Sequence, residues 1–527
     1  MSKIKNILFI MADQLRWDYL SCYGHPHLKT PNIDRLAEKG MKFDRAYVQS
    51  PVCGPSRASY YTGRTVFSHG ATWNQVPIGV DELGLDDYLK PAGITTALVG
   101  KTHQSVDPVG MERLGIDPNG EIGRHIREPG FTAYERDDGL HPDNGLKKRG
   151  GKLRYNDWLR EQGYEGENPW NDFANSAEDE NGEVLSAWHL RYSNLPARVK
   201  EEHSETAYMT NRAKQFITEM GDRPWLCHLS FIKPHWPYIA PAPYHDMYGP
   251  ESFLPINRID SERYDPHPVY EAFTQQQVGE VFSRQGVRDT VLPGYMGLIK
   301  QIDDRLGELF DWLEAEGKAD ETMIVFTSDH GDYMGDHWLG EKELFHDCSA
   351  RVPLLIYDPS PEADGTRGTS CDALVEAIDL VPTFIEATGA PGENHRLEGR
   401  SLAPLLRGER PDDWRTEAFS EIDYAFYTAR EQLDVDVSEA RAYMLRGDRW
   451  KYVYYKGFPP QLFDMQNDPN ELNDLGRHPD YEEVRRQMME KLLDRLTDRK
   501  NRVTYTDEQV LNTRKGENHS GVMIGVW

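Results

Sequence analysis

The chain has 527 residues and a formal net charge of −27 at neutral pH, with 38% hydrophobic and 28% charged residues. This length exceeds one small domain and fits a large α/β domain plus a smaller one. The excess of acidic residues excludes non-specific nucleic-acid binding, which relies on a basic surface. Any site for an anionic substrate must therefore concentrate positive charge locally.

The N-terminal segment, MSKIKNILFIMADQ, is basic and then apolar. A signal peptide is one interpretation, but the apolar stretch is short, lacks a small-residue cleavage site and runs into Asp13. We therefore expect a first buried parallel strand that ends at Asp13 and Gln14. No apolar run is long enough to cross a bilayer, so we expect no membrane partner. Five scattered cysteines favour a cytoplasmic protein with reduced thiols.

The next element in the chain is a predicted helix from Pro31, with Thr30 as its N-cap and Gly40 as its end. The stretch PVCGPSRASYYTG then holds a lone Cys53 before a second helix, which we expect to begin at Pro55 or Ser56. Arg57 in the first turn opposes the helix dipole, unless an anion binds there or the arginine orients a neighbouring group. A cysteine before a helix N-terminus favours a reactive thiol; a buried structural cysteine is the alternative.

Three further segments, ITTALVGKTH, RPWLCHLSFIKPHWPY and TMIVFTSDHGDYMG, are predicted strands that run into polar residues. A helix over about 296–316 separates the last two. The alternation predicts a doubly wound α/β sheet. Ligands bind beyond the carboxyl ends of such strands. We therefore expect four polar clusters to meet at one sheet edge: Asp13 with Gln14, Lys101 with His103, His235, and Asp329 with His330.

The rest of the chain divides by composition. Residues 1–403 form the predicted catalytic domain, with an insertion over the sheet edge at about 120–205. The aromatic side chains of this insertion line an aryl site or, as the alternative, pack in the core: Tyr134, Trp158, Trp170 and Trp188. Residues 404–500 predict a small antiparallel sheet with a packed helix. The tail at 501–527 reaches a partner subunit or docks on its own chain, and we expect a homodimer or higher homo-oligomer.

Two carboxylates, an amide oxygen and an imidazole at two strand ends suit a divalent metal ion. An all-oxygen shell favours Ca²⁺ or Mg²⁺, and the imidazole moves the choice towards Mn²⁺ or Zn²⁺. A turn with capping carboxylates is the alternative interpretation of SDHGD. The local positive charge would come from Lys101, His103, His235 and Lys342, each of which is otherwise an ordinary surface residue. Prolines on both sides of His235 fix its imidazole, as a general acid requires.

The motif CGPSR at residues 53–57, followed by TGR at 62–64, resembles the signature of the type I sulfatases in the alkaline phosphatase superfamily. Further motifs occur in the family's order and cover most of the chain: NILFIMADQ, GKTH, KPHWPY, FTSDHGDYMGDH and LFDMQNDPNELNDL. The Asp-His pair, GDH and APAPYHDMY also resemble the phosphonate monoester hydrolases. The resemblance implies an alkaline-phosphatase-like fold: a mostly parallel central sheet flanked by helices, with a smaller C-terminal antiparallel sheet and helix.

The resemblance further implies that a formylglycine-generating enzyme oxidises Cys53 and reads Pro55 and Arg57. The hydrated aldehyde would be a metal-bound diol; one hydroxyl attacks sulfur or phosphorus, and the second expels the product. The implied cofactor is one divalent metal ion, Mn²⁺ or Ca²⁺ first, with Zn²⁺ as the alternative. Its implied ligands are Asp13, Gln14, Cys53, Asp329 and His330.

The resemblance also assigns roles around the substrate, a small anionic ester. Arg57 would hold the diol, and Lys101 and His103 would contact the diol and the sulfate. His235 and Lys342 would stabilise or protonate the leaving oxygen. Asn74 would be a further polar contact, as in the phosphonate branch.

Two departures from the family pattern bear on the substrate. Many sulfatases carry Asp-Asp and Asp-Asn where this chain has Asp13-Gln14 and Asp329-His330, whereas phosphonate monoester hydrolases carry Tyr and Thr in place of Lys101 and His103. The predicted metal ligands thus resemble those of the phosphonate branch, whereas the predicted substrate contacts resemble those of the sulfatases. We predict an arylsulfatase-type hydrolase of sulfate monoesters with phosphonate and phosphate ester side activities. The alternatives are a phosphonate monoester hydrolase or phosphodiesterase with side sulfatase activity, and a non-catalytic anion-binding protein.

Overall fold

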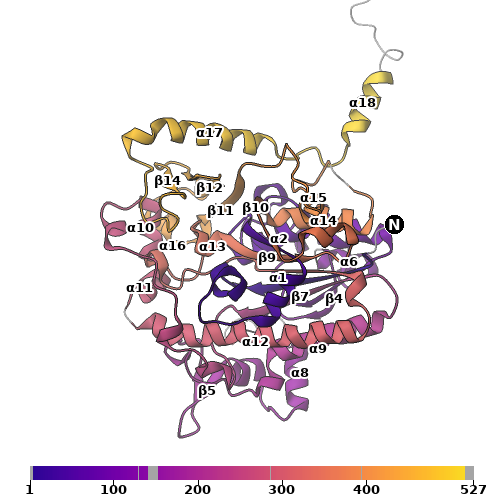
Figure 1. Ribbon diagram of the computed structural model, residues 1–527, viewed down its shortest axis with the longest axis vertical. Helices are drawn as coiled ribbons and strands as arrows, with labels where there is room; N and C mark the ends of the chain where they lie inside the picture. The colour runs from indigo at the N-terminus through magenta and orange to yellow at the C-terminus, as the bar shows by residue number, and fades with distance from the viewer. Residues whose placement is uncertain (1–3, 129, 141–151, 285, 393–394, 517–527) are drawn as a thin grey trace, which may run out of the picture.

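The centre of the protein, seen here in a computed structural model, is an eight-stranded sheet in the order β10-β2-β9-β8-β1-β7-β3-β4 (Figure 1). The structure describes residues 4–128, 130–140, 152–284, 286–392 and 395–516. The strands are β1 (Asn6–Asp13), β2 (Met41–Tyr47), β3 (Thr95–Gly100), β4 (Thr132–Arg136), β7 (Trp225–Pro234), β8 (Thr322–Thr327), β9 (Arg351–Tyr357) and β10 (Thr369–Glu376). Only β9 runs antiparallel to its neighbours among these eight, so the predicted mostly parallel sheet is confirmed.

Strand β1 lies between β7 and β8, and every one of its residues is buried. Its side chains alternate between two cores: Leu8 and Ile10 belong to one hydrophobic cluster, Phe9 and Met11 to the other. Such two-sided burial explains why the strand is a continuous apolar run. Because β8, β1, β7 and β3 are adjacent and parallel, their carboxyl ends share one edge of the sheet.

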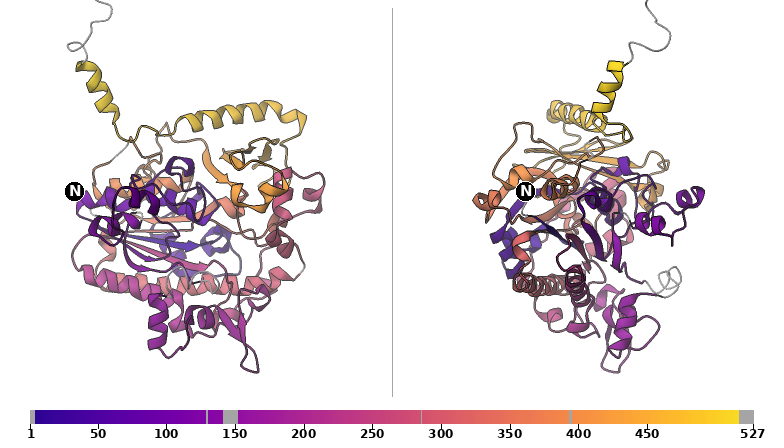
Figure 2. Two further views of the ribbon diagram at one scale, coloured as in Figure 1. Left: turned by 180° about the vertical axis from the view of Figure 1, so that it is seen from behind. Right: turned by 90° about the vertical axis from the view of Figure 1, so that its right-hand side faces the viewer.

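Helices cover both faces of the sheet, as the views in Figure 2 show. One face packs against α1 (Pro31–Lys39), α9 (Glu205–Met220) and α12 (Val287–Ala315). The other packs against α2 (Cys53–Thr62) and α14 (Leu380–Thr388).

Two of these helices test the predicted boundaries. Helix α1 begins at Pro31 and ends before Gly40, as predicted. The predicted start of α12 near residue 296 is wrong, because its buried apolar face continues through Val291 and Leu292 and the helix accommodates Pro293. An apolar face that persists on both sides of a proline can hold a helix together despite the lost hydrogen bond.

Residues 120–205 contribute β4 at the sheet edge, α8 (Arg154–Glu161) and the hairpin of β5 (Ser176–Glu178) with β6 (Val184–Ser186). The four aromatic residues named above pack against the core. Trp170 is buried, and the other three are partly buried against the same hydrophobic cluster.

The C-terminal part forms the antiparallel sheet of β11 (Ala418–Asp423), β12 (Arg441–Arg446), β13 (Trp450–Tyr455) and β14 (Gln461–Asp464). Helix α17 (Glu482–Thr497) packs on one face of it, and this confirms the predicted sheet and helix. Helix α18 (Asp507–Gly516) points away from the body in Figure 1. The rest of the predicted tail, from residue 517, lies outside the described residues, and the predicted oligomer stays a prediction.

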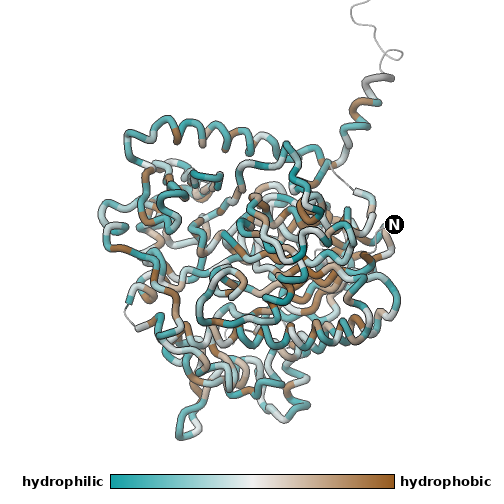
Figure 3. Tube along the Cα trace, in the orientation of Figure 1, coloured by the Kyte–Doolittle hydropathy of each residue, from teal (hydrophilic) through white to brown (hydrophobic). Residues whose placement is uncertain are grey.

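The hydropathy colouring of Figure 3 follows this layering, with the brown segments gathered in the central sheet and teal dominating α17 on the outside. Within the described residues, we find no helix that is both long and apolar enough to span a bilayer.

A buried ion-pair cluster joins the C-terminal sheet to the central domain. Lys451 of β13 is fully buried, and its Nζ lies 2.6 Å from Asp347 Oδ1, 2.5 Å from Glu471 Oε1 and 3.0 Å from the carbonyl oxygen of Phe345. Asp347 belongs to the short helix α13 (Asp347–Ala350), five residues after Lys342. The cluster therefore fixes the segment that carries a predicted site residue.

We expect Lys451→Met to lower the stability of the protein by about 3–5 kcal/mol, because it removes the buried cation that Asp347 and Glu471 share and leaves Asp347 with the longer ion pair to Arg351 at 3.7 Å. The matched control is Lys456→Met, which removes a half-exposed ion pair with Glu439 and should cost no more than about 1 kcal/mol. Thermal unfolding monitored by fluorescence measures both. Equal unfolding midpoints for the two variants would contradict the role of the cluster.

Candidate active site

Helix α2 begins at Cys53, so the predicted start at Pro55 or Ser56 is wrong by two or three residues. The Ser56 N–H donates to the Val52 carbonyl oxygen at 3.0 Å, which makes Val52 the N-cap. Pro55 fits the first turn because it lacks the N–H that would be unsatisfied there. Arg57 consequently lies in the second turn. Its side chain does not stay at the helix end but reaches the ends of the strands.

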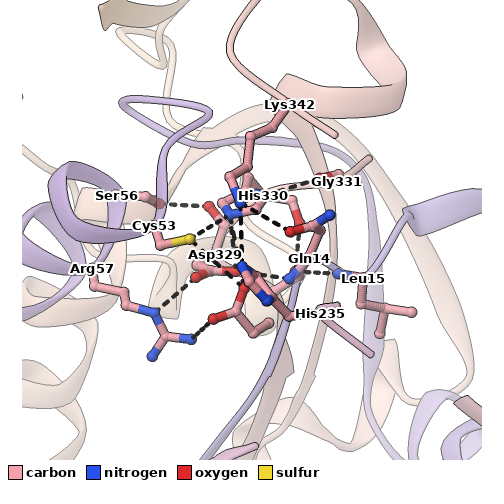
Figure 4. A network of polar contacts seen from close by, with 12 residues as sticks. Gln14, Leu15, Cys53, Ser56, Arg57, His235, Asp329, His330, Gly331 and Lys342 are labelled. Carbon is pink, nitrogen blue, oxygen red and sulfur yellow. Dashed lines mark hydrogen bonds and ion pairs between the residues drawn. The ribbon is translucent and has the colours of Figure 1, made fainter. Parts of the chain in front are cut away.

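Four predicted ligands come together at this edge of the sheet. One donor atom each from Asp13, Cys53, Asp329 and His330 lies within 4.8 Å of the other three, and all four residues are buried. Cys53 Sγ is 3.0 Å from His330 Nε2 and 3.8 Å from Asp13 Oδ1 (Figure 4). Two carboxylates, an imidazole and a fourth donor form a set that suits a divalent ion such as Mn²⁺ or Zn²⁺.

The orientation of His330 fits a metal ligand. Its Nδ1 donates to the carbonyl oxygen of Gly331 at 2.8 Å, so the lone pair on Nε2 faces the other donors. Such a hydrogen bond from the second ring nitrogen is typical of ligating histidines. Burial lowers the pKa of His330, only partly offset by the charge of Asp329. The imidazole is therefore neutral, as metal binding requires.

Gln14 adds a fifth donor through an unusual backbone conformation. Its φ of 64° lies in the left-handed region, and its N–H donates to Asp329 Oδ1 at 3.0 Å. The side-chain Nε2 donates to Tyr238 Oη at 2.9 Å and to Asp332 Oδ2. Oε1 is left to face the site, where Lys342 Nζ lies 2.9 Å away.

Asp332 and Tyr238 hydrogen-bond to the site, and the sequence analysis did not single them out. Tyr238 Oη donates to Asp332 Oδ2 at 2.7 Å, and burial raises the pKa of Asp332 to about 6. Together they decide which end of the Gln14 amide faces the ligand cluster. Their positions in two motifs could have pointed to them. Asp332 lies two residues after His330 in SDHGD, and Tyr238 lies three residues after His235 in KPHWPY.

Arg57 and Lys101 balance the two buried carboxylates. Arg57 Nε is 2.7 Å from Asp329 Oδ2, and Nη2 is 3.1 Å from Asp13 Oδ2. Nη1 donates to the Lys101 carbonyl oxygen at 2.8 Å and to Ser230 Oγ at 2.7 Å. Lys101 Nζ pairs with Asp13 Oδ2 as well. Burial alone would raise the pKa of Asp13, but the charges of Lys101 and Arg57 hold it well below its ordinary value.

His235 and Lys342 lie beside Gln14 on the other side of the ligand cluster. His235 Nδ1 donates to the Trp236 carbonyl oxygen at 2.8 Å, so Nε2 accepts from Lys342 Nζ at 3.3 Å. Burial and the charge of Lys101 lower the pKa of His235, so its imidazole is neutral. Burial would lower the pKa of Lys342, but negative groups, Cys53 and Glu341 first, raise it. Lys342 is therefore the protonated member of the pair.

Asn74 and His103 complete the predicted set in different ways. Asn74 Oδ1 accepts the N–H of Gly54 at 2.7 Å and so fixes the start of α2. The His103 imidazole is not brought into the network: within the described residues, its Nδ1 is buried without a hydrogen-bond partner. Of the eleven predicted residues, nine are joined to one another by the contacts given above, and Asn74 reaches them through Gly54. Their roles in a reaction stay predictions.

Comparisons with known proteins give two family matches and several relatives. Residues 5–390 match the Sulfatase family, and residues 335–498 match the family described as N-sulphoglucosamine sulphohydrolase, C-terminal. The chain is 31% identical over 516 residues to the multifunctional alkaline phosphatase superfamily protein PehA of Trinickia caryophylli, which covers 93% of this chain and 94% of that protein.

Two further relatives also match over most of the chain. The choline-sulfatase of Rhizobium meliloti (strain 1021) is 30% identical over 491 residues, which covers 90% of this chain and 83% of the relative. The crystal structure of the phosphonate monoester hydrolase of Agrobacterium radiobacter superposes with a TM-score of 0.79 at 29% identity, over 94% of this chain and 95% of that one.

We expect His330→Gln to lower the affinity for Mn²⁺ by more than about 10-fold, because it replaces a ligand whose lone pair is already oriented. The measurement is metal content after equilibrium dialysis. His267→Gln is the matched control, since His267 is equally buried but bonds the Pro459 carbonyl oxygen at 2.7 Å, away from the cluster. Identical metal content in both variants would contradict the assignment of the cluster.

Proposed function

The chain belongs to the sulfatase family, and from that premise we propose that it hydrolyses sulfate monoesters of the arylsulfatase type, with phosphonate and phosphate esters as side substrates. The observation that carries the proposal is the charge at the candidate active site. Three buried cations, Arg57, Lys101 and Lys342, lie among the buried carboxylates of the site. They offset Asp13, Asp329 and Asp332, and a divalent ion would make the site positive. Positive charge gathered at one place in a strongly acidic chain favours an anionic substrate.

The proposed metal ion would be held by Asp13, Gln14, Asp329 and His330, with the modified Cys53 as a further ligand. When bound, it would act as a Lewis acid on the ester group and lower the pKa of a coordinated hydroxyl. We propose that Cys53 is converted to formylglycine by a formylglycine-generating enzyme, because a hydrated aldehyde offers a nucleophilic hydroxyl and a second one for release. The start of α2 holds residue 53 among the other donors, 3.0 Å from His330 Nε2.

Arg57 and Asn74 help to hold residue 53 in position. Four of the five guanidinium N–H groups donate to Asp329, the Lys101 carbonyl oxygen, Ser230 and Asp13. Asn74 bonds the Gly54 N–H at 2.7 Å. Both side chains therefore orient the helix start and leave the substrate's charge to other groups.

Lys342 is the group we assign to the leaving oxygen. Its ammonium carries three N–H bonds, and Gln14 Oε1 and the neutral His235 accept two of them. The third is available to donate to the oxygen of the departing alcohol. His235 orients Lys342 rather than protonating the alcohol itself, because its ring is neutral in this arrangement.

A second candidate function is supported by a specific observation. Gln14 and His330 occupy the metal side as in the phosphonate branch, and the likeness to a phosphonate monoester hydrolase extends over 94% of the chain. In this alternative, the protein is a phosphonate monoester hydrolase or phosphodiesterase with side sulfatase activity. Initial rates on 4-nitrophenyl sulfate and 4-nitrophenyl phenylphosphonate separate the two, because both esters release the same alcohol.

For enzyme prepared with a formylglycine-generating enzyme and Mn²⁺, we expect a higher kcat/KM on the sulfate ester. The reverse order would replace the first candidate by the second. Hydrolysis of neither ester, by protein with a converted Cys53 and a bound metal ion, would contradict both.

We expect Lys342→Met to lower kcat/KM by about 10²–10⁴-fold, because it removes proton donation to the leaving oxygen. The loss should grow with the pKa of the departing alcohol, so a phenyl ester should suffer more than a 4-nitrophenyl ester. Lys300→Met is the control, since Lys300 pairs with Asp303 at 3.2 Å on α12. An equal loss on both esters would show that Lys342 does not act on the leaving group.

A further inference from the structure

The loop after β3 holds a buried hydrogen-bond donor that none of the contacts above uses. Gln104 is only 3% exposed, and its Nε2 has no hydrogen-bond partner in the part of the chain that the structure describes. Burying an amide without an acceptor is unfavourable, and native proteins rarely tolerate it without a reason. A ligand that supplies the acceptor would remove this cost.

The Gln104 amide faces the first turn of α2. A methyl group placed on Gly54 would lie 2.9 Å from Gln104 Nε2 and 3.0 Å from Asn74 Oδ1. Gly54 directly follows Cys53, so the unpartnered N–H bonds lie beside the nucleophile. They also lie at the N-terminus of a ten-residue helix, where the macrodipole favours an anion.

The loop that carries Gln104 is fixed by its neighbours. Asp138 Oδ1 accepts the N–H groups of both Thr102 and His103 at 2.9 Å. Arg136 donates to the Gln104 carbonyl oxygen at 3.1 Å and pairs with Asp138 Oδ2 at 2.8 Å. The backbone that carries the Gln104 side chain is therefore fixed before any ligand binds. A donor on a fixed backbone binds negative charge with little reorganisation.

The contacts of Lys342 and Gln104 locate the Gln104 amide relative to the leaving group. Lys342 bonds Gln14 at the end of β1 and His235 at the end of β7. Gln104 follows β3 and lies against Gly54, away from these two partners of Lys342. We therefore expect the amide beside Gly54 to meet a terminal oxygen of the ester, because Lys342 is assigned to the leaving oxygen.

We propose that the Gln104 carboxamide donates a hydrogen bond to a terminal oxygen of the sulfate monoester and thereby favours sulfate over phosphonate esters. A sulfate monoester presents three terminal oxygens to the site. A phosphonate monoester presents two, and a carbon substituent takes the place of the third, which cannot accept a hydrogen bond. The proposal rests on the proposed function and names a specificity-determining residue for it.

The test compares Gln104→Met with the parent enzyme in two measurements. The first is the ratio of kcat/KM for 4-nitrophenyl sulfate over 4-nitrophenyl phenylphosphonate, with converted Cys53 and bound Mn²⁺. The second is the affinity for inorganic sulfate, measured by calorimetry in the Cys53→Ala background, which needs no turnover. We expect both to fall by roughly 10-fold or more, as the loss of a hydrogen bond to an anion predicts.

Two variants guard against a merely structural effect. Gln301→Met is the matched control, because Gln301 is 1% exposed but its amide is partnered with Glu201 and Ser204; it should change neither measurement. Gln104→Glu is the substitute if Gln104→Met does not fold. It keeps the size of the side chain, and its negative charge should weaken sulfate binding more than Gln104→Met does.

An unchanged sulfate affinity together with an unchanged ratio would overturn the proposal, and a weaker sulfate affinity with an unchanged ratio would overturn the preference for sulfate. Failure of the proposed function is a separate outcome. If the parent hydrolyses neither ester, sulfate binding in the Cys53→Ala background still decides whether Gln104 contacts the anion.

Discussion

The burial of two carboxylates against one guanidinium is the constraint on which the site depends. Asp13 ends β1 and Asp329 follows the adjacent parallel strand β8, and neither residue has any exposed surface. Arg57 bridges them, with Nη2 3.1 Å from Asp13 and Nε 2.7 Å from Asp329. Removing one partner from such a buried network costs about 3–5 kcal/mol. The arginine therefore fixes the spacing of the carboxylates, and with it the place of any ion that they hold.

The fold supplies each part of this network from a different segment. The sheet brings the carboxylates together, α2 places residue 53 above them, and the segment before α13 carries Lys342. The buried cluster around Lys451 ties that last segment to the C-terminal sheet. The small sheet is thus more than an appendage, because it stabilises the loop that brings a cation to the substrate side.

Much of this could be predicted from the sequence, for physical reasons. An apolar run that ends in a polar residue identifies a buried parallel strand and its carboxyl end, so Asp13 and Asp329 could be expected at one edge. The start of α2 could not be placed, because Pro55 is compatible with either the first turn or the position before a helix. Asp332, Tyr238 and the amide of Gln104 act through contacts between distant loops, which periodicity does not encode.

The most direct test of the account is the mass of the tryptic peptide that contains Cys53, residues 46–57, from protein made together with a formylglycine-generating enzyme. The account predicts loss of the thiol and a mass that matches an aldehyde or its hydrate. An intact thiol, in material where a known substrate of the same modifying enzyme is converted, would contradict the proposed nucleophile and leave a metal site with an unmodified cysteine beside it.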